Sequence, residues 1–122
     1  MAKLTVSRFK DLDETRAHYL ATVDTEAERL RMQHVTPGNG QTMTYEAKHR
    51  EALAGGGPMI TAEAEALEVT EQEVIGSVLA ARGRWELAGA KIEAARIKAK
   101  RDIRAATTPA EMHATSKGAF ND

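Results

Sequence analysis

Apolar residues recur along this chain at intervals of three and four, the spacing of amphipathic α-helices. The first such series is Leu12, Thr15, Tyr19, Val23, Ala27 and Leu30. Asp11 or Asp13 can cap its start, because an aspartate side chain accepts a hydrogen bond from a free amide in the first turn of a helix. A helix is therefore expected from about Leu12 to Val35.

Glycine and proline interrupt the periodic pattern twice. The segment TPGNG at 36–40 has the composition of a turn, and a second helical stretch is expected at 41–54. The segment GGGP at 55–58 ends that stretch and reads as a flexible joint. An acidic, alanine-rich segment at 59–67 then predicts a short helix.

The longest predicted helix begins at a capping box. Thr70 can accept a hydrogen bond from the Glu73 amide, while the Glu73 side chain reaches back to the Thr70 amide. Two adjoining seven-residue series follow and form one narrow apolar stripe: Val78, Trp85, Ile92, Ala99 and Ala106, beside Val74, Ala81, Ala88 and Ala95. Such a stripe predicts a helix of about 36 residues, or about 54 Å, that packs along its whole length. Val78, Trp85, Ile92 and Ala99 are its expected packing seam.

A proline fixes the end of this long helix. Pro109 disfavours helical geometry at Thr108, and Thr108 with Glu111 can form a second capping box. A short terminal helix is therefore expected to about Thr115. Residues 116–122 show no periodicity and are expected to fold only against something else.

These elements predict an all-α fold, a helical hairpin or small bundle with one long C-terminal helix. A hydrophobic content of 42% with five aromatic residues supports only a thin core. We expect a single domain over residues 1–122. Its parts are the N-terminal helical stretches at 1–54, the joint at 55–58, the acidic segment and long helix at 59–106, and a terminal hook at 107–122.

Charge is unevenly distributed although the net charge is only −1. Residues 82–104 contain eight basic and three acidic side chains, whereas 54–81 contain five acidic and no basic ones. We expect the basic face around Arg96, Lys100 and Arg104 to meet acidic surface, within or between subunits. A nucleic-acid partner is disfavoured, because such a binder keeps its basic surface unopposed and often adds aromatic residues.

The aromatic residues admit two interpretations. Trp85 is favoured as a buried residue that holds a thin helical hairpin together, and the alternative is an anchor that enters a partner's pocket. Tyr19 and Tyr45 are expected in the core with their hydroxyls at its edge.

Residue chemistry points to no enzyme, cofactor or metal site. The chain has no cysteine, its histidines lack metal-ligand spacing, and none of its serines stands in a nucleophile motif. The alanine-rich stripe buries too little area for strong membrane binding, and we find neither a signal peptide nor a membrane span.

Three segments together resemble a family of small helical proteins encoded among the tail and tail-fibre genes of tailed bacteriophages. The matching positions are Tyr45, Lys48, Glu51 and Ala52, then Trp85, Ile92, Glu93 and Arg96, then Ile103, Ala106, Thr108 and Glu111. The resemblance covers roughly residues 41–115. It implies a non-enzymatic virion or tail-assembly role and brings no catalytic or ligand residues with it.

The leading hypothesis is therefore a structural phage protein of the tail or baseplate, assembled in the host cytoplasm and located in the virion. Its expected partners are copies of itself and other phage structural proteins, with no small-molecule substrate. The alternatives are a transient tail or tail-fibre assembly chaperone, and a small nucleic-acid-associated protein.

Overall fold

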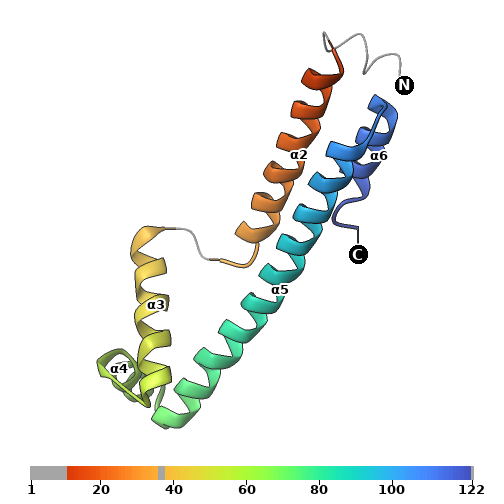
Figure 1. The fold of residues 1–122 in the computed structure, drawn as a ribbon. Coiled ribbons are helices and arrows are strands. Elements are labelled where there is room, and N and C mark those ends of the chain that lie inside the picture. Colours follow the sequence, from red (N-terminus) through yellow and green to blue (C-terminus); the bar gives the residue numbers. More distant parts are fainter. Residues whose placement is uncertain (1–10, 36–37, 122) are drawn as a thin grey trace. The chain divides into compact units, whose positions relative to one another are not determined.

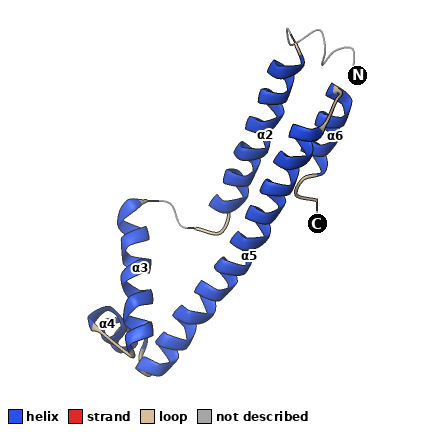
Figure 2. Ribbon diagram, in the orientation of Figure 1, coloured by secondary structure: helices blue, strands red, loops and turns tan. Residues whose placement is uncertain are grey.

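A computed structural model describes residues 11–35 and 38–121 (Figure 1). Over these residues the chain forms five helices and no strand, which confirms the all-α class (Figure 2). The helices are α2 (Leu12–Met32), α3 (Asn39–Ala54), α4 (Pro58–Leu67), α5 (Glu71–Ala105) and α6 (Pro109–Gly118). Part of the predicted turn, at 36–37, lies outside the described residues.

The chain divides into two compact units, which are described separately. Unit 1 consists of Met1–Gln33 together with Gly89–Asp122, and unit 2 is His34–Ala88. The long helix α5 belongs to both, because its first half contributes to unit 2 and its second half to unit 1.

In unit 1, α2 packs antiparallel to the C-terminal half of α5, and α6 completes the core (Figure 1). The buried core side chains are Tyr19, Val23, Ala99, Ile103, Ala106 and Met112. Ala119 and Phe120 pack against this core. The prediction that the tail folds only against something else was wrong for its described part, because an aromatic side chain next to the end of α6 reaches the core.

The predicted corner at the end of α5 is confirmed. Thr108 caps α6, with its hydroxyl oxygen 3.2 Å from the Glu111 amide nitrogen. The hydroxyls of Thr107 and Thr108 donate to the Glu111 carboxylate. Arg16 of α2 reinforces the same corner, since its Nε and Nη2 lie 3.4 Å and 2.9 Å from the carbonyl oxygens of Ile103 and Ala106. These contacts satisfy carbonyls that the end of a helix leaves free.

Unit 2 is built by α3, α4 and the N-terminal half of α5. Its buried core is Ala52, Ile60, Ala64, Val74 and Ile75, with Val78 partly buried against it. Gly55 ends α3 at a φ of 92°, a left-handed conformation that glycine adopts readily. The Thr70–Glu73 capping box is confirmed, with both of its hydrogen bonds at 3.1 Å. α3 begins earlier than the turn composition predicts, at Asn39, because Gly38 takes the N-cap position.

Candidate functional site

The predicted packing seam of α5 is not buried along its whole length. Ile92 and Ala99 are buried in unit 1, and Val78 is partly buried against the core of unit 2. Trp85, by contrast, leaves 40% of its surface exposed. The interpretation of Trp85 as a buried core residue was therefore wrong. The buried core of unit 2 extends along α5 only to Val74 and Ile75, and the neighbouring seam residue Ala81 is itself exposed.

Trp85 instead lines a pocket within unit 2, which we call the Trp85 pocket. Its walls include Tyr45 of α3 and Trp85 of α5, with Val78 and Ala81 contributing apolar surface. Its volume is about 410 Å³, within the range of protein ligand sites. Tyr45 is 45% exposed, so the prediction of a core position for it was also wrong. Tyr45 and Trp85 are therefore two partly exposed aromatic side chains that line the same pocket.

The charged groups around the pocket are paired. Arg82 binds Glu46 at 2.6 Å and Glu86 at 3.2 Å, and its guanidinium carbon lies 5.5 Å from the centroid of the Trp85 ring. The hydrogen bond with Glu46 raises the pKa of Arg82, which therefore stays charged. Because each of these charges already has an opposite partner, the pocket favours a neutral occupant.

A second pair joins the two short helices of the unit. Lys48 of α3 binds Glu63 of α4, with Nζ and Oε1 2.5 Å apart. Glu63 belongs to the acidic stretch that the sequence predicts as the partner of the basic face, but its partner in the structure is Lys48. This ion pair adds a further balanced charge to the pocket lining.

One residue that lines the pocket carries an unsatisfied polar atom. His49 Nδ1 is buried and has no hydrogen-bond partner among the described residues. Leaving such an atom unpaired costs free energy, because buried polar atoms nearly always have a partner. Ser77 lines the same pocket, yet no hydrogen bond joins it to His49 Nδ1. The geometry thus lacks the nucleophile–base contact of covalent catalysis at this nitrogen.

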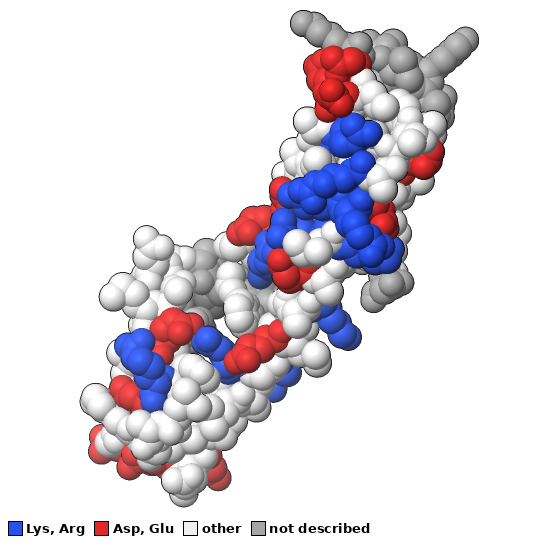
Figure 3. Space-filling view, viewed as in Figure 1, with Lys and Arg blue, Asp and Glu red and all other residues white. Residues whose placement is uncertain are grey.

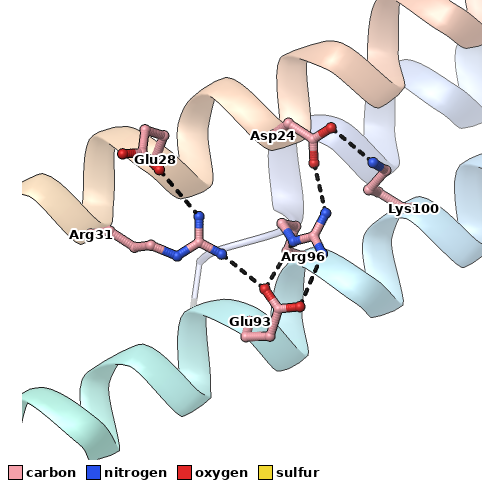
Figure 4. Close-up of polar contacts among 6 residues, drawn as sticks. All are labelled: Asp24, Glu28, Arg31, Glu93, Arg96 and Lys100. Carbon is pink, nitrogen blue, oxygen red and sulfur yellow. Dashed lines mark hydrogen bonds and ion pairs between the residues drawn. The ribbon is translucent and has the colours of Figure 1, made fainter.

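The predicted basic face lies in unit 1, where two of its three residues turn toward α2 (Figure 4). Arg96 Nη1 lies 2.9 Å from Asp24 Oδ1, and Lys100 Nζ lies 2.8 Å from Asp24 Oδ2. Arg96 also binds Glu93 on its own helix at 2.9 Å. Arg104, the third residue, is exposed and forms no ion pair among the described residues. Arg96 and Lys100 therefore share Asp24 as an acidic partner, Arg96 has Glu93 as a second one, and neither pairs with the acidic stretch at 63–73.

These contacts keep the network ionised. The Lys100 hydrogen bond, followed by that of Arg96, lowers the pKa of Asp24 despite an opposing effect of burial. Arg96 likewise lowers the pKa of Glu93, with a smaller contribution from Arg31, which lies 2.8 Å away. Groups held so firmly in their charged forms are poorly suited to proton transfer near neutral pH. The network's evident role is to join α2 to α5.

Spacing along the helix indicates the Glu93–Arg96 pair of this network, but sequence reasoning missed the part of Asp24 in it and missed the pocket. Asp24 adjoins the buried Val23 in α2, and a charged residue at the edge of an apolar stripe is the signal that could have identified it. Arg16 occupies a similar edge position next to Thr15. The pocket had no sequence signal, since it depends on how α3 approaches α5 in space.

Other chemistry is limited in the described part of the chain. The Tyr19 hydroxyl lies 3.0 Å from His113 Nδ1, a contact that ties α6 to α2. Within residues 11–35 and 38–121, no three His, Asp or Glu side chains gather as a metal site would require. No helix in those ranges is both long and apolar enough to cross a membrane. Comparisons with protein-family models, curated proteins and solved structures found no match for this chain.

Proposed function

We propose that this chain is a non-enzymatic structural protein of a bacteriophage particle, a tail or baseplate component that packs its helices against other protein chains. Those chains are copies of itself and neighbouring tail proteins. The observation that supports a protein-binding role is the half-exposed Trp85 in the wall of an apolar pocket. The phage setting is supported by the resemblance of residues 41–115 to tail-gene proteins.

Trp85 and Tyr45 have the character of binding anchors. Tryptophan and tyrosine are enriched where protein interfaces gain most of their energy, because they bury a large area with few rotatable bonds. Their position beside a pocket of paired charges allows an apolar side chain of another protein to enter without leaving a charge unpaired.

The seam pattern supports the same role. Its seven-residue repeat is typical of helices that pack against a partner along their length, yet Ala81 and Trp85 remain exposed in the single chain. A second helix laid along this part of α5 would complete the burial that the repeat predicts.

Quantitative mass spectrometry of purified particles tests the proposal. The chain is expected in the finished particle at a fixed ratio to the major tail proteins, after washing in high salt. Its absence from particles, together with abundance in the cells that produce them, would overturn a virion role and favour the transient assembly chaperone.

A further inference from the structure

The solvent-facing side of the C-terminal half of α5 carries a second surface, which we call the outer face. It consists of Lys91, Ile97, Lys98, Arg101 and Arg104. With 100° of rotation per residue, these positions lie away from the buried Ile92, Ala99 and Ile103, and all of them are exposed. Ile97 is 52% exposed at its centre. Figure 3 shows Lys and Arg gathering over this part of unit 1.

Few carboxylates in the described part of unit 1 neutralise the outer face. Asp24 and Glu93 are occupied by Arg96 and Lys100, which lie on the flank of the helix next to α2. On the outer side, Lys98 and Arg101 share the single carboxylate of Asp102. Lys91 and Arg104 form no ion pair among the described residues. Four cations against one carboxylate leave an excess of positive charge around an exposed isoleucine.

Unit 2 presents a surface of the opposite kind, which we call the acidic corner. It surrounds the junction of α4 and α5 and consists of Glu65, Leu67, Glu68, Val69, Glu71 and Glu73, all exposed. Leu67 is 62% exposed at its centre. None of the four glutamates forms an ion pair among the described residues. Two of them accept hydrogen bonds from Thr61 and the Thr70 amide instead.

The two surfaces are complementary in charge and similar in composition. The acidic corner belongs to unit 2 and the outer face belongs to unit 1. Each has an exposed aliphatic side chain, Leu67 or Ile97, among its charged groups. A second copy of the chain therefore offers each surface a partner of opposite charge.

We propose that the acidic corner of one copy binds the outer face of another copy, with Leu67 packing near Ile97 and glutamates facing Lys98, Arg101 and Arg104. An exposed apolar centre within a charged rim is the usual composition of a protein interface, and the two rims have opposite signs. Because the two surfaces differ, the contact is head-to-tail, and repeated copies form a ring or an open filament. This contact uses neither Trp85 nor its pocket.

Two paired neutralisations test the head-to-tail contact by sedimentation velocity. Arg101→Gln with Arg104→Gln disables the outer face, and Glu65→Gln with Glu68→Gln disables the acidic corner. Wild-type chain is expected to form oligomers in low salt and to dissociate in high salt. Each double variant alone is expected to lose about tenfold or more in association constant, since two rim contacts are removed.

The decisive sample is an equimolar mixture of the two double variants. The intact corner of one then meets the intact outer face of the other, and a dimer forms that cannot extend. Arg50→Gln with Arg84→Gln, which removes the same charge from exposed positions without ion pairs among the described residues, should assemble as wild type does.

Three results would overturn the contact: a wild-type chain that stays monomeric in low salt, double variants that assemble normally, or a mixture that yields no dimer. A monomeric chain whose outer face instead binds DNA in a salt-dependent manner would replace the second copy with nucleic acid. Mass spectrometry of particles is independent of these samples, so failure of the contact is distinguishable from failure of the virion role.

Discussion

Lys100 of α5 and Asp24 of α2 form an ion pair, with Nζ 2.8 Å from Oδ2, while Arg96 binds the other oxygen of the same carboxylate. One acidic side chain thus holds two cations of the basic run against its own unit. Lys91, Lys98, Arg101 and Arg104 of that run are exposed to solvent. Asp24 therefore separates charges that stabilise the fold from charges that are available to another chain.

Acidification should weaken unit 1 through Asp24. Its pKa is lowered in the folded chain, so the stabilisation is complete above the unfolded value near 4 and is lost as the pH falls through the folded value. The melting temperature should therefore decline on going from about pH 6 to below about pH 4. In Asp24→Asn this decline should be smaller, and circular dichroism against temperature at each pH measures both. An identical pH profile for the two proteins would contradict a role for Asp24.

Arg16→Ala should loosen the corner between α5 and α6. The guanidinium donates to the carbonyls of Ile103 and Ala106, so its removal should lower the free energy of unfolding by about 1–2 kcal/mol. Arg16→Lys keeps the charge but cannot bridge both carbonyls, and an intermediate loss is expected. Urea denaturation compares the three proteins. Equal stability of the alanine variant and wild type would show that the corner does not need Arg16.

Two isoleucines on one helix provide a matched test of the core. Ile103 is fully buried and Ile97 is half exposed. Ile103→Ala should lower the free energy of unfolding by about 2–4 kcal/mol, because it leaves a cavity. Ile97→Ala should change it by about 0.5 kcal/mol or less. Urea denaturation compares the two variants in high salt, where the chain should be monomeric, and the loss should be larger for Ile103→Ala. Similar losses at both positions would contradict the packing of α5 in unit 1.

The exposure of Trp85 can be read directly, since it is the single tryptophan of the chain. Its emission should resemble that of a solvated indole, and acrylamide should quench it readily. Trp85→Ala should lower the free energy of unfolding by only about 1 kcal/mol, well below the loss at a buried tryptophan. A loss of about 3 kcal/mol or more, together with emission that acrylamide does not quench, would show that Trp85 is a buried core residue.

Local chemistry made much of the fold predictable from the sequence. Asp11, Thr70 and Thr108 cap helices as their side chains and positions indicate. Gly55 marks a boundary through a left-handed conformation that most other residues disfavour. Pro109 marks one because its ring disfavours helical geometry at the residue before it and it has no N–H. Whether a segment is helical, and where the helix ends, depends on a few neighbouring residues. These features could therefore be predicted from the sequence pattern.

The sites depend on contacts between helices and were less predictable. An apolar stripe with a seven-residue repeat shows that a helix can pack along its length. It does not show whether the same chain supplies a packing partner at Trp85. Charge counts likewise favoured the acidic stretch as the match for the basic face. They could not distinguish Asp24, which adjoins the α2 stripe, from glutamates elsewhere in the chain. The register between α2 and α5 decides that contact.

Site-specific photo-cross-linking tests the proposed protein-binding role most directly. A benzoylphenylalanine placed at the exposed Ala81, which lines the Trp85 pocket, would react with whatever chain covers it during particle assembly. The same group at the exposed Ala114 of α6 serves as the control. We predict a cross-link from position 81 to a tail protein or a second copy, and none from position 114. Cross-links that are absent at position 81, or equal at both positions, would contradict the account.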